Sequence, residues 1–193
     1  MATTDDNRTI RGIDNVGYLR LLKNAHKEAA KLIRYQTSMD FELSRDSDTT
    51  ATKDGSVAIP GAMETEVTIE FLDGINEVSD DAYTAILNGE TVELWKVNRA
   101  RKNDEGKYFG WYMQGEITGD SNSNDADDAS TRELTVTVSG TPKRGWLTLS
   151  KDQQEELEVG FRGLKAITEE DPTGDGTAFN DADAGKGSLA TNE

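Results

Sequence analysis

The amino-acid sequence predicts a mainly β protein, a sandwich or barrel with one or two short flanking helices and one long strand hairpin. Two stretches carry this prediction, because apolar and polar residues alternate along Ile33–Leu43 and again along Met63–Phe71. Strict alternation is typical of a strand that buries one face. At about 3.3 Å per residue the first stretch would reach roughly 36 Å, whereas most strands have about 5–6 residues.

Composition is compatible with one main folded domain and argues against several protein classes. Hydrophobic residues make up 34% of the 193 residues, and the absence of Cys excludes disulfide frameworks and thiolate metal sites. The net charge of −16 disfavours a protein that grips DNA phosphates or anionic membranes, although solubility alone would also explain it. With no signal-peptide pattern and no long apolar window, we expect no membrane partner and synthesis in a cytoplasm.

Three segments are expected along the chain: a polar N-terminal arm at 1–12, a β domain at 13–165 and an acidic extension at 166–193. The extension holds seven acidic residues, one basic residue and three large apolar residues. Such a segment buries too little apolar surface to offset the entropy of ordering it, so we expect it to be flexible unless another subunit holds it.

The first half of the β domain should contain a short strand and the long hairpin. We expect the short strand at Tyr18–Leu22 and at most one helical turn within Asn24–Arg34, before the strand at Ile33–Leu43. The polar stretch Ser44–Ala62 should connect the two long strands, with turns at Asp54-Gly55 and Pro60-Gly61. A connection of this length is usually functional or disordered.

The second half should begin with a short helix and continue as strands. Ser79 is the expected N-cap of the helix, and Asn88-Gly89 its end. Further strands are expected at Thr91–Asn98, Lys107–Gly119, Thr131–Ser139 and Gly145–Leu149, separated by a charged turn at Arg99–Gly106 and a loop at Asp120–Ser130. Gly110 and Gly115 should mark bulges or close packing. Ser150 and Gln153 form a capping box, whereas residues 157–164 fit helix and strand equally well.

The sequence contains few residue patterns suited to catalysis or to metal binding, so we expect no catalytic, cofactor or metal site. His26 is the only His, and it lies in a polar stretch without a Cys or a second His as partner. The loops beginning at Asp120 and Asp171 lack the Gly or Glu that a calcium-binding EF-hand loop requires. The aromatic cluster Tyr108–Tyr112 could bind a sugar, but such residues more often belong to a core or an interface.

The long hairpin itself is the most informative feature. Exposed strand edges promote aggregation in a monomer, whereas in a ring of identical subunits each edge can be paired by a neighbour. The sequence therefore favours a self-assembling protein.

Several segments resemble the major tail protein family of long-tailed phages with non-contractile tails, the group typified by lactococcal phages. The likeness covers about residues 15–165 and follows the order of the elements. The segments that carry it are Leu32–Met39, Asp48–Gly55, Met63–Phe71, Val92–Asn98, Asn103–Thr118 and Glu133–Thr148.

The resemblance implies a structural virion protein that is assembled in the host cytoplasm into hexameric rings, which stack into a tube for DNA ejection. Its partners would be further copies of itself and the tape measure, tail terminator and distal tail proteins, with DNA passing through without specific binding. The resemblance also implies that the loop between the long strands reaches the next ring; the candidates there are Asp48, Thr52, Lys53, Asp54 and Gly55.

An acidic lumen would repel the DNA backbone and let it slide. Glu64, Glu66 and Glu70 share one strand face and are the candidates for its lining; an outer solvated face is the alternative. Two other functions stay open: a carbohydrate-binding β-sandwich of a baseplate or cell surface, and a tube protein of a contractile injection system.

Overall fold

The computed structural model describes residues 9–150, 153–154, 161–168, 170–171, 173–180, 182 and 184–186. The chain forms two compact units, Met1–Thr148 and Leu149–Glu193. The elements of the first unit are η1 (Gly12–Asp14), β1 (Asn15–Leu21), η2 (Leu22–Asn24), β2 (Lys31–Leu32), β3 (Gln36–Thr52), β4 (Gly55–Leu72), α1 (Glu77–Asn88), β5 (Thr91–Lys102), β6 (Tyr108–Ser123), β7 (Thr131–Val138) and β8 (Lys143–Leu147).

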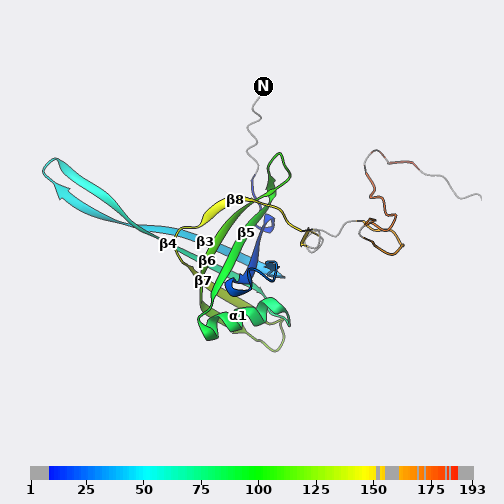
Figure 1. Ribbon diagram of the computed structural model, residues 1–193, viewed down its shortest axis with the longest axis horizontal. Helices are drawn as coiled ribbons and strands as arrows, with labels where there is room; N and C mark the ends of the chain where they lie inside the picture. The colour runs from blue at the N-terminus through cyan, green and yellow to red at the C-terminus, as the bar shows by residue number, and fades with distance from the viewer. Residues whose placement is uncertain are drawn as a thin grey trace, which may run out of the picture. The chain divides into compact units, whose positions relative to one another are not determined.

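The eight strands form one antiparallel sheet in the order β2-β1-β5-β6-β7-β4-β3, with β8 paired to β6 (Figure 1). The predicted mainly β class is therefore confirmed. The long strand β6 takes part in both halves of the sheet. Its first half pairs with β5 and β8, and its second half pairs with β7.

The long hairpin is much longer than predicted. Ser44–Ala62, expected to be a connection, is instead the outer half of the hairpin, because β3 continues to Thr52 and β4 begins at Gly55. We call residues 44–62 the arm and the rest of the first unit the body; Figure 1 shows the arm projecting from the body. The turn predicted at Asp54-Gly55 is present at the tip.

Two details of the hairpin also differ from expectation. Pro60-Gly61 is not a turn: it lies within β4 at a bulge, where Gly61 and Ala62 of β4 together lie opposite Asp46 of β3. Proline is tolerated there because the other edge of β4 has no described partner before Glu66. At the inner end, β3 begins at Gln36 and not at Ile33, because Tyr35 has a left-handed φ of 56° that interrupts the strand.

The helix prediction was right in place and wrong in its cap. Asn76, and not Ser79, is the N-cap of α1, and its side chain accepts a hydrogen bond from the Ser79 amide at 2.9 Å. Gly89 ends the helix in the left-handed conformation with φ of 63°, as predicted. Asn24–Arg34 contains the end of η2, a short turn and the two-residue strand β2, so it has no more than the one helical turn expected.

The later strands extend into regions that were predicted as loops. β5 continues through Arg101 to Lys102, and β6 continues through Asp120 to Ser123, so the loops are shorter than expected. Gly115 is a site of close packing, as predicted, because a Cβ there would lie 2.2 Å from the Thr137 carbonyl oxygen.

The core lies between the two halves of the curled sheet. It contains the inward residues of β4, β5 and β7, among them Val67, Ile69, Val92, Leu94, Leu134 and Val136, all fully buried. The sheet curls far enough for β1 to meet the start of β3. There the Gly17 amide donates to Gln36 Oε1 at 2.8 Å, and Gln36 Nε2 donates to the Gly17 carbonyl oxygen at 3.0 Å. A side-chain amide thus replaces a backbone partner at this seam.

A buried arginine connects α1 to the sheet. Arg132 lies on the inner face of β7 and is only 1% exposed. Its Nε and Nη2 donate to the two oxygens of Asp120 at 2.8 and 2.6 Å, and Nη1 donates to the Ser79 carbonyl oxygen at 3.2 Å. Burial by itself lowers the pKa of Arg132, but the hydrogen bonds and charge of Asp120 outweigh it, so the pKa lies above its ordinary value.

In the second unit, Ser150 and Gln153 form the predicted capping box. The Ser150 amide donates to Gln153 Oε1 at 2.9 Å, and the Gln153 amide donates to Ser150 Oγ at 3.2 Å. Residues 157–160 lie outside the described residues, and residues 161–164 are in neither helix nor strand. Asp171 accepts hydrogen bonds from the Thr173 amide and hydroxyl and from the Asp175 amide, which lower the pKa of its carboxyl.

Candidate functional site

The outward side chains of four neighbouring strand segments, in β6, β7, β4 and β3, form one acidic face. Cross-strand pairing places Glu42 opposite Glu66, Glu66 opposite Thr137, and Thr137 opposite Glu116, so these four residues form a row across the sheet. A parallel row, four residues further along β3, β4 and β7, consists of Ser38, Glu70, Glu133 and Ser121. Seven exposed carboxylates lie on the acidic face: Asp40, Glu42, Glu64, Glu66, Glu70, Glu116 and Glu133.

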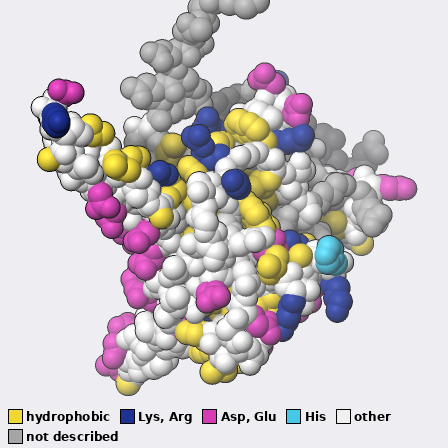
Figure 2. All heavy atoms as spheres, turned by 60° about the vertical axis from the view of Figure 1, so that its left-hand side comes forward, with side chains coloured by type: hydrophobic (Ala, Val, Ile, Leu, Met, Phe, Trp, Pro, Cys, Tyr) yellow, Lys and Arg dark blue, Asp and Glu magenta, His cyan; other side chains and the backbone are white. Residues whose placement is uncertain are grey.

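This arrangement does not favour the stability of the isolated sheet. Glu42 faces Glu66 directly, and Glu70 faces Glu133 directly. Like charges in such positions repel each other. No Lys or Arg occupies an outward position in these four segments. Figure 2 shows acidic side chains gathered along the margin of the body below the arm. The concentration of charge therefore points to a role beyond folding.

The structure places all three predicted lining residues, Glu64, Glu66 and Glu70, in exposed positions on the acidic face. Sequence reasoning missed Asp40 and Glu42, although the alternation along β3 already placed them on its polar face. Glu116 and Glu133 could not be found in this way. Their place on the acidic face follows from the register of β6 and β7, which the sequence does not give.

The four-stranded array also has two open edges. Among the described residues, β3 pairs with β4 alone, and β6 has no partner on its β5 side after Glu116. Because the four strands alternate in direction, β3 and β6 run antiparallel to each other. The outer edge of β3 in one copy could therefore pair in antiparallel fashion with the free edge of β6 in another.

The arm carries all five residues predicted for the long loop. Lys53 and Asp54 form the turn at its tip, and the Thr52 hydroxyl donates to the Gly55 carbonyl oxygen at 2.6 Å. Every residue from Ser44 to Ala62 is exposed. Val57 and Ile59, which are 53% and 55% exposed, share one face of the arm with Asp48. The arm thus presents apolar and acidic groups that nothing in the first unit covers.

Aromatic and basic side chains gather at the end of the body that carries β8. Arg101 lies over the rings of Phe109 and Trp146, at 4.1 and 5.6 Å, and Arg144 lies over Trp111 at 5.5 Å. Phe109 and Trp111 share a face, as predicted, with ring centroids 6.5 Å apart. Trp111 also packs 5.2 Å from Phe41 against the core. Much of the predicted aromatic cluster is therefore used in packing.

The described residues contain no group of three or more His, Asp or Glu side chains suited to a metal ion. Among them, too, no helix has the length and apolar character needed to cross a membrane.

Comparison with known proteins gives a consistent result. A family model described as phage tail tube protein matches residues 11–144. No curated protein sequence matches the chain. Among solved structures, the SPP1 tail tube has a TM-score of 0.67 at 18% identity and covers 82% of this chain and 91% of its own.

Two structures of gene transfer agent particles are also similar. The tail of the empty particle, refined with C6 symmetry, has a TM-score of 0.56 at 13% identity over 70% of this chain and 98% of its own. The native virion has a TM-score of 0.56 at 12% identity over 71% and 99%. At these identities the similarity establishes the fold.

Proposed function

The chain belongs to the phage tail tube protein family, and from this premise we propose that six copies join through the open edges of β3 and β6 into a ring whose acidic face lines the lumen. The observation that carries the proposal is the acidic face on an array that identical copies can extend at both sides. The C6 symmetry of the gene transfer agent tail, which has the same fold, supports six copies.

In such a ring the rows of the acidic face would continue from copy to copy. The row of Glu42, Glu66 and Glu116 would become a closed band of carboxylates, and the row of Glu70 and Glu133 a second band. A carboxylate-lined passage repels the phosphates of DNA and prevents adhesion to the wall. The role is structural and not enzymatic: the protein provides a non-adhesive path for the genome.

Stacked rings would form the tube, with the arm of each copy reaching the adjacent ring. Complete exposure of the arm in the single copy, with Val57 and Ile59 uncovered, supports this role. In an assembled virion such an arm should be covered by a neighbouring copy, because exposed apolar strand edges favour association. Tape measure, tail terminator and distal tail proteins are the further partners we propose.

The test compares virions whose tails carry wild-type protein, the neutral triple variant Glu64→Gln/Glu66→Gln/Glu70→Gln, or the reversed variant with Lys at the same positions. All three should assemble tails of normal length, since these side chains lie outside the core. Genome ejection should be fastest for wild type, slower for the Gln variant and slowest for the Lys variant. Equal ejection rates in all three, with intact tails, would show that these residues do not line the DNA path.

A further inference from the structure

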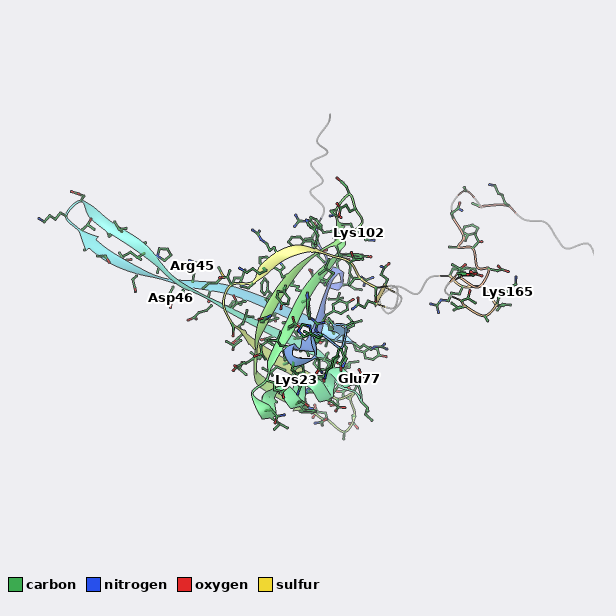
Figure 3. All side chains as sticks on the ribbon, in the orientation of Figure 1. Lys23, Arg45, Asp46, Glu77, Lys102 and Lys165 are labelled. Atoms are coloured by element: carbon green, nitrogen blue, oxygen red, sulfur yellow. The ribbon has the colours of Figure 1, made fainter. Side chains whose placement is uncertain are left out.

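The two ends of the body carry opposite charge. One end consists of η1, the β5–β6 turn and β8, where segments 10–14, 99–107 and 139–147 hold seven basic and three acidic residues. The other end contains α1 and the β6–β7 loop, where segments 72–90 and 123–131 hold eight acidic residues and no basic one; Lys31 and Lys23 from outside these segments pair with three of the eight, Glu77, Asp81 and Glu90. Figure 3 shows Lys102 at one end of the body and Glu77 at the opposite end. Because β5 runs from one end to the other over 12 residues, the ends lie roughly 35–40 Å apart.

At the basic end, four cations have no carboxylate partner within the part of the chain that the structure describes: Arg101, Lys102, Lys143 and Arg144. Arg101 is held between two aromatic rings and Arg144 over a third, so the guanidinium groups are positioned without an ion pair. Trp146 is 45% exposed beside them. The basic end therefore offers preorganised cations around an exposed aromatic ring.

The acidic end has the complementary character. Asp80, Asp125, Asp127 and Asp128 are exposed and form no ion pair with a described residue. Large apolar side chains lie exposed at the same end: Ile75 is fully exposed and Leu87 is 80% exposed. The β6–β7 loop and α1 belong to one surface, because the Asp73 amide donates to the Ser130 carbonyl oxygen at 2.8 Å and Asn122 donates to the Tyr83 hydroxyl at 3.1 Å.

We propose that the basic end of one copy docks onto the acidic end of a second copy, with Arg101 and Arg144 facing Asp125 and Asp127 and with Trp146 covered by the apolar side chains beside α1. This contact rests on the proposed tube and adds to it the surface through which one ring meets the next. Different patches on one molecule give a head-to-tail contact that repeats without limit, as a tube requires. The opposite charges also make all copies stack in the same direction, because two basic ends or two acidic ends would repel each other.

Charge reversal tests the contact. In Arg101→Glu/Arg144→Glu, two new carboxylates would face the acidic end of the next copy. In Asp125→Lys/Asp127→Lys, two new ammonium groups would face the basic end. Because like charges repel, each variant should raise the protein concentration needed for tube formation by about tenfold or more. The chain with all four substitutions has both ends reversed and should assemble as wild type does. Lys165→Glu/Lys186→Glu gives the same change of net charge as the first variant within the second unit and should have no effect.

Cysteine cross-linking gives a second readout, because the chain has no Cys. The double variant Asp127→Cys/Lys143→Cys should oxidise to a ladder of covalent oligomers beyond the dimer, whereas either single variant can form at most a dimer. Circular dichroism and thermal unfolding of each variant establish that the body is folded.

The outcomes separate this contact from the tube itself. If wild type forms tubes while both charge-reversed variants form them at the same concentration and no ladder appears, the contact is wrong and the tube stands. If wild type forms neither rings nor tubes in virions or in concentrated solution, the proposed function fails. Loss of duplex DNA binding in Arg101→Glu/Arg144→Glu, with unchanged assembly, would assign the basic end to the genome and overturn the contact.

Discussion

The side-chain amide of Gln36 satisfies both backbone hydrogen-bonding groups of Gly17, with distances of 2.8 and 3.0 Å. Gln36 Nε2 also donates to the Ile33 carbonyl oxygen at 2.5 Å. One side chain therefore closes the seam where β1 meets the start of β3. The close approach is possible because residue 17 is Gly: a Cβ there would lie 3.3 Å from Gln36 Oε1.

Gln36→Leu should lower the free energy of unfolding by about 1–3 kcal/mol, because it leaves the amide of the buried Gly17 unpaired, whereas the Gly17 carbonyl keeps the Ile33 amide as donor at 3.1 Å. Chemical denaturation followed by tryptophan fluorescence measures the change. Thr37→Ala, at the exposed neighbouring position, is the matched control and should change the free energy by less than about 0.5 kcal/mol. An equally small change for Gln36→Leu would mean that the seam is closed by other contacts.

Asp120→Asn should destabilise the body by about 3–5 kcal/mol, because it removes the carboxylate from a fully buried guanidinium. Replacement of both partners, Asp120→Leu/Arg132→Leu, should cost less than the sum of the single substitutions. A double-mutant cycle measured by thermal unfolding gives the coupling between them. Additive effects would contradict a direct ion pair between Asp120 of β6 and Arg132 of β7.

Gly115→Ala should cost about 2–3 kcal/mol or prevent folding, because the new methyl group overlaps the Thr137 carbonyl and forces β6 and β7 apart. Gly145→Ala is the control, since a Cβ at residue 145 has open space around it. The melting temperatures of the two variants provide the comparison, and similar values would refute the close approach at Gly115.

Tyr112→Phe should destabilise the body by about 1–2 kcal/mol at neutral pH, since the phenol donates to Glu93 Oε1 at 2.7 Å. Burial, followed by the Glu93 hydrogen bond, raises the pKa of the Tyr112 phenol. The protonated phenol is thus favoured in the folded state, so its contribution is complete below the unfolded pKa of about 10 and is lost as the pH rises through the folded pKa.

The advantage of wild type over Tyr112→Phe should therefore shrink above about pH 10. Unfolding curves of both proteins at pH 7, 9 and 11 test the direction of this effect. A difference in the free energy of unfolding between the two proteins that grows with pH would contradict a raised pKa of the Tyr112 phenol.

Replacement of residues 46–62 by Asn-Gly should remove the arm without unfolding the body. Arg45 and Met63 face each other, so a two-residue turn can join them directly. Because the arm buries nothing in the core, the free energy of unfolding should stay within about 1 kcal/mol of wild type. Electron microscopy should show that tubes no longer form. Tubes of normal length from the shortened chain would refute a role of the arm between rings.

Local patterns predicted the strands well where one face is buried. The alternation at Met63–Phe71 and at Thr131–Ser139 matches the buried faces of β4 and β7, and Asn88-Gly89 marked the end of α1. The same signal failed in the arm, where both faces are exposed. A two-stranded ribbon that covers no core needs no apolar periodicity, so its Ser, Thr, Asp and Gly residues resembled a loop.

The functional surfaces could be predicted only in part, because some of their residues lie on strands that are far apart in the sequence. Glu64, Glu66 and Glu70 lie on one strand, so their shared face follows from a period of two. Glu116 joins them across β7 only through the register of three strands, and the basic end combines β5 with β8. The alternation places Arg132 on the same face as Leu134 and Val136, but its burial was missed because the partner that makes it possible, Asp120, lies on another strand.

The bulge in β4 opposite Asp46 constrains how the arm can vary among related chains. Beyond the bulge each residue of β3 faces one residue of β4, from Ser47 opposite Pro60 to Thr52 opposite Gly55. Insertion or loss of one residue on a single strand would turn Val57 and Ile59 to the opposite side. Natural lengthening or shortening should therefore occur by matched pairs on both strands, and a size difference of an odd number of residues should coincide with a second bulge.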